Sequence, residues 1–252
     1  VEERDPEYDD KVGQRLDGRS LVSEWQQANP QGAYVWNADQ LKAAANAPAI
    51  FGLFEPDHMQ YEYERANDAG GEPSLAELTR TAIANLSKEK QGYVLMIEGA
   101  RIDHANHSGN AYRALTDTVA MSDAVRVATE MTRDDDTLII VTADHSHTLN
   151  FVGYPARGNP ILGKVKDKGG EDGLGGLDLA RDGGGQPYTT LSYANGPGFT
   201  GATNQQPAGA KRYPHNPSSF DPSTGRPDLT AVDTEHPDYM QEALGPGKGG
   251  SQ

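Results

Sequence analysis

The chain has 252 residues, a formal net charge of −15 and no cysteine. So anionic a surface argues against binding to nucleic acid or anionic lipid, because both are recognised with Lys and Arg. The lack of cysteine excludes disulfides, thiolate metal ligands and a Cys nucleophile. No run approaches ~18 consecutive apolar residues, so no transmembrane helix is predicted, and no signal peptide is visible.

The first half of the chain alternates helical and strand patterns. Its first four predicted elements are a helix through Leu21–Gln26 capped by Asp17, a strand over Ala33–Trp36, a helix over 38–46 and a strand over Ile50–Phe54. The next four are a helix over Leu75–Leu86 opened by Pro73 and Ser74, a strand over Tyr93–Ile97, a helix over 110–132 and a strand over Thr137–Thr142. The continuous apolar runs at 93–97 and 137–142 predict strands buried on both faces, which is typical of parallel sheets.

The composition changes after Gly153. Residues 164–186 are mostly Gly, Asp and Lys, and residues 195–230 are rich in Pro, Gly, Asn and Ser, with one candidate strand over Tyr188–Tyr193 between them. Too little apolar periodicity remains there for a separate core. We therefore expect an α/β fold with a largely parallel sheet flanked by helices over 1–153, and a loop-rich extension of the same domain over 154–252.

Two clusters of acids and histidines directly follow the two strongest strand predictions. The first cluster lies in Glu98–His107 and the second in Thr142–His147. In open α/β sheets ligands bind outside the carboxyl ends of the strands. Parallel pairing would therefore bring both clusters to one edge of the sheet.

The residue types in these clusters are those that hold metal ions. Asp103 and His107 are four residues apart and would share one helix face, and Asp144 and His145 form a second pair; both residue types are zinc ligands. Glu98 would suit magnesium. A site with several metals can clamp the attacking and leaving oxygens of a displacement at phosphorus. Taken singly, each of these residues is also compatible with a solvated or capping role.

The residues resemble a family at this point. Glu98–His107 is similar to the E-G-x-x-I-D-x-x-x-H segment of alkaline phosphatases, and Val141–His147 is similar to their V-T-A-D-H-S-H segment. The resemblance spans roughly residues 50–200. It implies that Asp103 and His107 bind one zinc, that Asp144 and His145 bind a second zinc, and that Glu98 binds magnesium.

The resemblance also implies roles around these ligands. His104 matches a position that contacts phosphate through water. For His147 the resemblance implies no direct metal contact. The segment with Phe54, Glu55 and Glu72 resembles a peripheral calcium site, in which the Phe supplies its backbone carbonyl. Simple surface acidity is the alternative interpretation of these acids.

The resemblance implies hydrolysis of phosphate monoesters through a phosphoserine intermediate, by a homodimer. We expect a periplasmic or secreted protein, and the net charge argues against nucleic acid or membrane as a partner. The Asp-Ser-Ala nucleophile segment and the third ligand of one zinc have no match in this sequence. We therefore expect an internal portion of a longer phosphatase, with a shortened relative as the alternative. Two other interpretations stay open: a sulfatase or phosphomutase-type relative, and a non-catalytic metal-binding or oligomerisation fragment.

Overall fold

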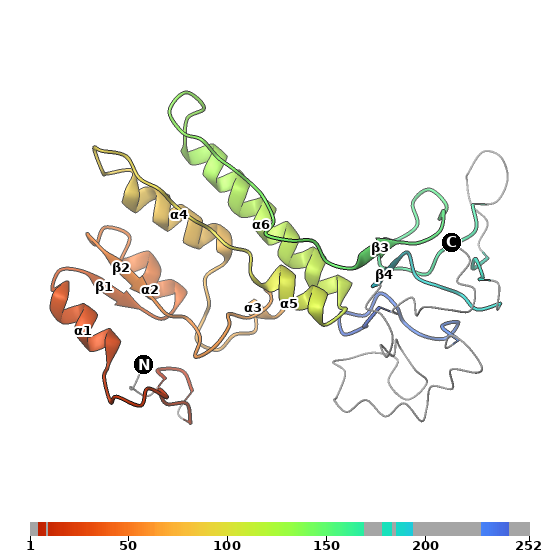
Figure 1. Cartoon of the computed structure of the whole chain (residues 1–252), viewed down its shortest axis with the longest axis horizontal. Coiled ribbons are helices and arrows are strands. Elements are labelled where there is room, and N and C mark those ends of the chain that lie inside the picture. The colour runs from red at the N-terminus through yellow and green to blue at the C-terminus, as the bar shows by residue number, and fades with distance from the viewer. Residues whose placement is uncertain (1–4, 9, 169–177, 183–184, 194–227, 242–252) are drawn as a thin grey trace. The chain divides into compact units, whose positions relative to one another are not determined.

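The computed structural model describes residues 5–8, 10–168, 178–182, 185–193 and 228–241, and its elements are drawn in Figure 1. The chain divides into two compact units. The first unit comprises Val1–Arg101 with Thr116–Thr142, and the second comprises Ile102–Leu115 with Ala143–Gln252. Helix α6 (Ala111–Met131) therefore starts in the second unit and continues in the first.

The first unit contains a small parallel sheet with short helices. Its strands β1 (Ala33–Val35) and β2 (Ile50–Gly52) pair in parallel, in register Ala33 with Ile50. Its complete helices are α1 (Leu21–Ala28), α2 (Ala38–Ala43), α3 (Glu62–Arg65) and α4 (Leu75–Leu86). Val35 and Leu41 form a core with Ala44, against which Phe54 and Leu78 pack. Sheet and helices thus hold together through apolar burial, as expected from the sequence pattern.

Side-chain caps fix the starts of three of these helices, α1, α2 and α4. Ser74 and Glu77 form a capping box at α4, each bonding the other's backbone N–H,. The prediction that Asp17 caps α1 is wrong. Ser20 is the cap, because its hydroxyl accepts the Ser23 N–H at 3.2 Å, whereas Asp17 pairs with the Arg15 guanidinium.

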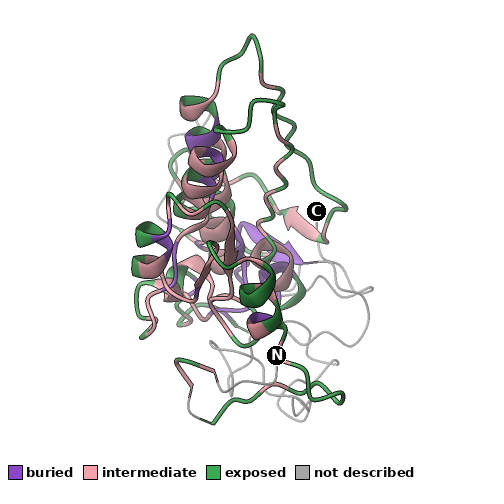
Figure 2. Cartoon of the chain, turned by 90° about the vertical axis from the view of Figure 1, so that its left-hand side faces the viewer, coloured by how far each residue is buried: buried purple, intermediate pink, exposed green. Residues whose placement is uncertain are grey.

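The two apolar runs predicted as buried strands are extended but unpaired. No strand is assigned in Tyr93–Ile97 or Thr137–Thr142, both of which lie wholly within the described residues. Val94 is 97% exposed and Leu138 is 84% exposed, and Figure 2 shows such exposed stretches outside the helices. The expectation of burial on both faces is therefore wrong for this chain, because no described strand lies beside either run to cover its side chains.

The second unit is built around a helical corner and an antiparallel pair of strands. It contains nearly all of α5 (Arg101–His107) and the start of α6. β3 (Leu149–Phe151) pairs antiparallel with β4 (Leu191–Tyr193), which shortens the strand predicted over Tyr188–Tyr193. Leu191 and Tyr193 are buried against Ala111 of α6. This packing fixes the corner where the candidate metal ligands lie.

None of the helices in the described ranges combines the length and apolar character that crossing a bilayer requires. The described elements are helices and strands in both units. These elements do not form the larger parallel sheet expected from the sequence, because β1 and β2 are the only parallel pair among the described strands.

Candidate functional site

Helix α5 presents two of the predicted ligands on one face. Asp103 and His107 are four residues apart, and Asp103 Oδ2 lies 3.5 Å from His107 Nε2. The helix ends in a Schellman motif, in which Asn110 N–H bonds the Ala105 carbonyl and Gly109 adopts a φ of +67°,. His107 therefore lies in the last turn of a helix whose end is well defined.

The segment before β3 brings two more histidines to Asp103. His147 Nε2 donates to Asp103 Oδ1 at 2.6 Å, and His145 Nε2 lies 3.6 Å from the same oxygen. The His147 ring makes edge contacts with the rings of His107 and His145, at centroid distances of 4.9 and 5.1 Å. One carboxylate is thus surrounded by three imidazoles.

This arrangement keeps Asp103 ionised. Partial burial alone would raise the pKa of the carboxyl, but the hydrogen bond from His147 and the neighbouring imidazoles outweigh burial and lower it below its usual value,. An ionised carboxylate with nearby imidazole nitrogens is the donor set that zinc prefers. The chemistry of this cluster therefore fits a zinc ion.

The ligand atoms of Asp103, His107 and His147 lie within 4.8 Å of one another. His147 was not predicted as a ligand, although a signal for it exists. His145 and His147 are two residues apart in the sequence, a spacing at which side chains of an extended backbone face the same side. We refer to Asp103, His107, His145 and His147 as the histidine cluster.

The other residues predicted around this site have different surroundings. The Asp144 side chain is 87% exposed and bonds its neighbour, accepting the His145 N–H at 3.0 Å. His104 lies on α5, and its carbonyl accepts the Ser108 N–H in the helix end. Glu98 is exposed and belongs to the first unit. The structure thus brings Asp144 to the edge of the cluster, while the roles of Glu98 and His104 stay predictions.

A second group of metal-binding side chains lies in the first unit and contains acids only. Carboxylate oxygens of Glu7, Glu55 and Asp68 lie within 4.8 Å of one another, and we refer to them as the acidic cluster. Gly70 N–H donates to Glu7 Oε1 at 2.9 Å. Tyr8 OH donates to Glu55 Oε1 at 3.3 Å, and Gln60 Nε2 donates to the same oxygen at 3.0 Å.

The acidic cluster contains one of the three predicted calcium-site residues. Glu55 is a member, whereas Glu72 is 4% exposed and both its oxygens accept the Gln60 N–H. Phe54 packs its ring on the core of the first unit. Glu7 was missed because it lies 48 residues before Glu55, and no motif in its own neighbourhood marks it as a ligand.

The electrostatics of the acidic cluster are opposite to those of the histidine cluster. Burial together with the charge of Asp68 raises the pKa of both Glu7 and Glu55. Burial raises the pKa of Glu72 to about 7, and burial with the charge of Glu55 raises that of Tyr8 to about 12. Glu7 Oε2 is buried with no hydrogen-bond partner among the described residues. Uncompensated oxygens of this kind fit a hard cation such as calcium.

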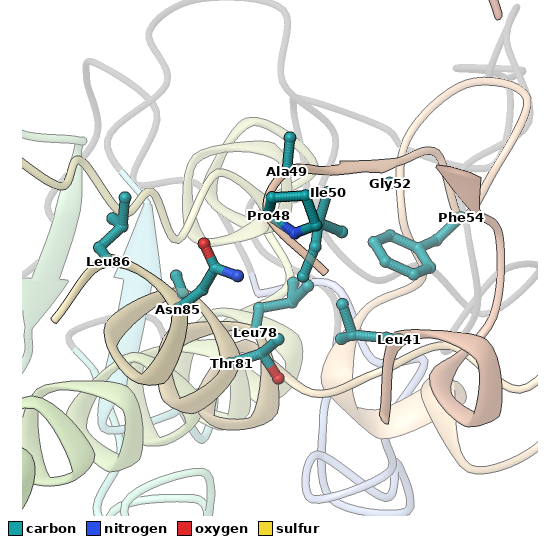
Figure 3. Close-up of a pocket in the computed structure, with 11 residues that line it drawn as sticks. Leu41, Pro48, Ala49, Ile50, Gly52, Phe54, Leu78, Thr81, Asn85 and Leu86 are labelled. Atoms are coloured by element: carbon teal, nitrogen blue, oxygen red, sulfur yellow. The ribbon is translucent and has the colours of Figure 1, made fainter. Parts of the chain in front are cut away.

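The first unit also contains an apolar pocket of about 490 Å³ between β2 and α4, shown in Figure 3. Leu41 and Phe54 face Leu78 across it, and Asn85 is one of two polar residues in the lining. Asn85 Nδ2 donates to the Ala47 carbonyl at 2.6 Å. Its eleven lining residues include no acidic, basic or histidine side chain, so the pocket offers no group for acid–base or metal chemistry.

Comparisons with known proteins point to one family. The profile of the alkaline phosphatase family matches residues 1–231. The chain is 42% identical over 192 residues to the membrane-bound alkaline phosphatase of Bombyx mori, covering 74% of this chain and 32% of that protein. It is 36% identical over 246 residues to the tissue-nonspecific alkaline phosphatase of Gallus gallus, covering 96% of this chain and 41% of that protein.

Among solved structures, the alkaline phosphatase of Thermus thermophilus matches with a TM-score of 0.43 and 33% identity. That match covers 46% of this chain and 24% of the other. The chain thus spans between about a third and two fifths of the length of the two curated relatives.

Proposed function

Because the chain belongs to the alkaline phosphatase family, we propose that it supplies zinc ligands to an enzyme that hydrolyses phosphate monoesters. The observation that carries this proposal is the histidine cluster, which gathers around one ionised carboxylate in a chain whose family is defined by that activity. Since the chain spans only part of its relatives' length, the activity is proposed for the complete enzyme.

The residues of the cluster have separable tasks in this proposal. Asp103 supplies the anionic oxygen, and His107 and His147 supply neutral nitrogens from two different segments. His145 and Asp144, adjacent to them, are proposed to hold a second zinc. Zinc bound at such a site supplies Lewis acidity for a hydroxyl nucleophile and for the leaving oxygen. In the metal-free chain the hydrogen bond from His147 Nε2 to Asp103 Oδ1 keeps these two candidate ligands together, and a zinc ion bound by both would take the place of the shared proton.

The remaining parts of the proposal come from the family resemblance. Glu98 would bind magnesium, and His104 would contact the phosphate through water. The serine nucleophile and the phosphoserine intermediate are proposed for the complete enzyme, because this sequence has no Asp-Ser-Ala segment. A small phosphate monoester as substrate, a homodimeric assembly and a periplasmic or secreted location belong to the same proposal.

The exposed apolar runs support a larger fold in the complete enzyme. Val94, Met96, Leu138 and Ile140 are all more than 70% exposed, an arrangement that costs solvation free energy unless a neighbouring strand covers it. We propose that both runs pair in the largely parallel sheet expected from the sequence. Slow amide hydrogen exchange at 93–97 and 137–142 in the full-length protein would support this pairing, and fast exchange there would contradict it.

A second candidate function rests on the acidic cluster. Three converging carboxylates, one of which has a buried oxygen with no hydrogen-bond partner in the described part of the chain, support a calcium site that stabilises the first unit. Glu7 and Asp68 join the predicted Glu55 in this proposal, while Glu72 and the Phe54 carbonyl stay candidate ligands nearby.

The test of the main proposal measures zinc binding and turnover separately. Asp103→Asn should weaken zinc binding to the chain by at least ~100-fold, since it removes the one anionic ligand. In the full-length enzyme it should lower kcat for p-nitrophenyl phosphate by on the order of 10²–10³. Asp134→Asn, at an exposed position, is the matched control.

Unchanged zinc binding in Asp103→Asn would contradict the metal assignment. Zinc binding without EDTA-sensitive turnover by the full-length protein would favour the non-catalytic metal-binding interpretation. Preferential hydrolysis of sulfate esters would favour the sulfatase-type interpretation.

A further inference from the structure

The link between α5 and α6 is a tight corner made by Ser108–Asn110. Gly109, with its positive φ, ends α5, and Asn110 N–H closes the motif on the Ala105 carbonyl. The same Asn110 begins α6, because its Oδ1 accepts the Arg113 N–H at 2.9 Å,. One residue therefore ends one helix and caps the next, so that any shift at the corner changes the direction of α5.

A distant segment binds this corner. Within Pro237–Gln241, which we call the corner-binding segment, Gln241 N–H donates to the Gly109 carbonyl at 2.9 Å. The Gln241 Oε1 accepts the Ala111 N–H at 2.7 Å. The Pro237 carbonyl accepts from Asn110 Nδ2 at 2.8 Å.

Arg113 adds two more bonds to the same segment. Its guanidinium donates to the Pro237 carbonyl at 2.8 Å and to Asp238 Oδ1 at 2.7 Å. The corner-binding segment thus reaches the corner through backbone and side-chain groups at both of its ends.

The bonds that Gln241 and Asn110 make at this corner are shielded from water. Gln241 is 1% exposed, Ala111 is 0% exposed and Asn110 is 2% exposed. A buried N–H that loses its acceptor cannot turn to solvent instead, so the Ala111 N–H depends on Gln241. The preceding residues are anchored as well, since Lys164 Nζ donates to the carbonyls of Leu229 and Val232 at 2.8 Å each.

The corner lies close to the candidate ligands. His107 is two residues before Gly109, and α5 has only seven residues, so the helix is too short to absorb a change at its end. Asn106, the residue before His107, accepts the Tyr193 hydroxyl at 2.7 Å. The neighbours of His107 are therefore held from β4 on one side and from the corner-binding segment on the other.

We propose that Gln241 is a positioning residue for the histidine cluster. It holds the Gly109–Ala111 corner and thereby sets the distance and angle between His107 on α5 and His147 on the segment before β3. The expected effect on zinc binding rests on the proposed zinc site. The hydrogen bonds that Gln241 makes to the end of α5 are present in the metal-free chain. This role is separate from ligation, because Gln241 touches no member of the cluster in the contacts described.

Three variants of the 252-residue chain separate positioning from mere stability. Gln241→Leu removes the acceptor of the Ala111 N–H, and Gln241→Glu keeps an acceptor oxygen at that place. Val165→Ala is the control: it opens a cavity at a side chain that is 1% exposed in the same unit, and its backbone pairs with Tyr188 and Ala180 rather than with the corner.

Two readouts are taken under conditions where each variant is folded. In metal-free chain, amide exchange of residues 105–107 should be at least ~10-fold faster in Gln241→Leu relative to the rest of the unit, and unchanged in the other two variants. With zinc, the dissociation constant should rise ~10–100-fold in Gln241→Leu alone. The visible spectrum of bound Co²⁺ should change in the same variant, because its intensity depends on ligand geometry.

Unchanged exchange at 105–107 in Gln241→Leu would overturn the proposal, whether or not the chain binds zinc. Equal loss of zinc affinity in Val165→Ala would also overturn it, because general loosening would then explain the effect. A wild-type chain that binds no zinc would count against the proposed function instead, and the exchange data would still decide the role of Gln241.

Discussion

The histidine cluster and the acidic cluster differ in how their carboxylates are balanced. In the second unit one carboxylate has three imidazoles around it, and its pKa is lowered. In the first unit three carboxylates face one another, and burial together with the charge of Asp68 raises the pKa of both Glu7 and Glu55. The first arrangement is favourable without a metal, whereas the second is strained until a cation or protons neutralise it.

This difference separates the metals that each cluster should take. Nitrogen ligands with one oxygen favour zinc, and an all-oxygen group favours calcium. The comparison therefore predicts that a change in one cluster alters the affinity for one metal and leaves the other metal unaffected.

The largest effect is expected in the histidine cluster. His147→Ala should raise the zinc dissociation constant by ~10–100-fold, because it removes a nitrogen ligand and frees the Asp103 carboxylate to rotate. Calorimetric titration with zinc and then with calcium would measure both affinities. His58→Ala, at an exposed histidine of the first unit, is the control. Equal zinc binding in both variants would contradict the assignment of His147 as a zinc ligand.

The acidic cluster should respond in the opposite way. Glu55→Gln should lower calcium affinity by ~10-fold or more, since affinity depends on the number of charged ligands. The same change should raise the Tm of the metal-free chain, because it removes repulsion from Asp68 and Glu7. Thermal unfolding with and without calcium would measure both effects, with exposed Glu89→Gln as the control. A lower Tm without metal would contradict the strain argument.

A smaller effect is expected from a change that moves a ligand without removing it. A Cβ at Gly70 would lie 2.2 Å from Glu7 Oε2, so that Gly70→Ala must displace the end of this flexible side chain. Calcium affinity should fall by roughly 3- to 10-fold while the fold persists. Ala69→Ser, at the exposed neighbour, is the control, and unchanged calcium affinity in Gly70→Ala would place Glu7 outside the site.

The sequence was most informative where the chemistry is local. Asp103 and His107 share a helical turn, and Asp144 and His145 are adjacent, so that motif and spacing were enough to predict them as candidate ligands, whereas His147 in the same run was not predicted. Glu7 and Gln241 escaped detection because each acts on residues far away in the sequence, through contacts that only the folded chain creates. Tyr93–Ile97 has the apolar pattern of a buried strand, but pairing depends on a neighbour that a local pattern cannot specify.

A half-buried acid outside both clusters gives the smallest test of the same comparison. Asp117 in the first unit accepts the Glu62 N–H at 3.3 Å and belongs to neither cluster. Burial raises its pKa to about 6 from 3.8. The folded chain therefore binds more protons than the unfolded chain between these pH values, and the stability contributed by the protonated group is lost as the pH rises through about 6.

Asp117→Asn should remove the free-energy cost of half-burying an ionised carboxylate while keeping an oxygen for the Glu62 N–H. The free energy of unfolding at pH 8 should rise by roughly 1–2 kcal/mol, allowing for solvent screening of a half-buried group, and it should change little at pH 4. Denaturant unfolding at both pH values would measure the difference, with exposed Asp39→Asn as the control. Because Asp117 is not a member of the acidic cluster, calcium should not change this gain. A calcium-dependent gain would mean that Asp117 shares the cation of the acidic cluster, and its assignment outside that cluster would then be wrong.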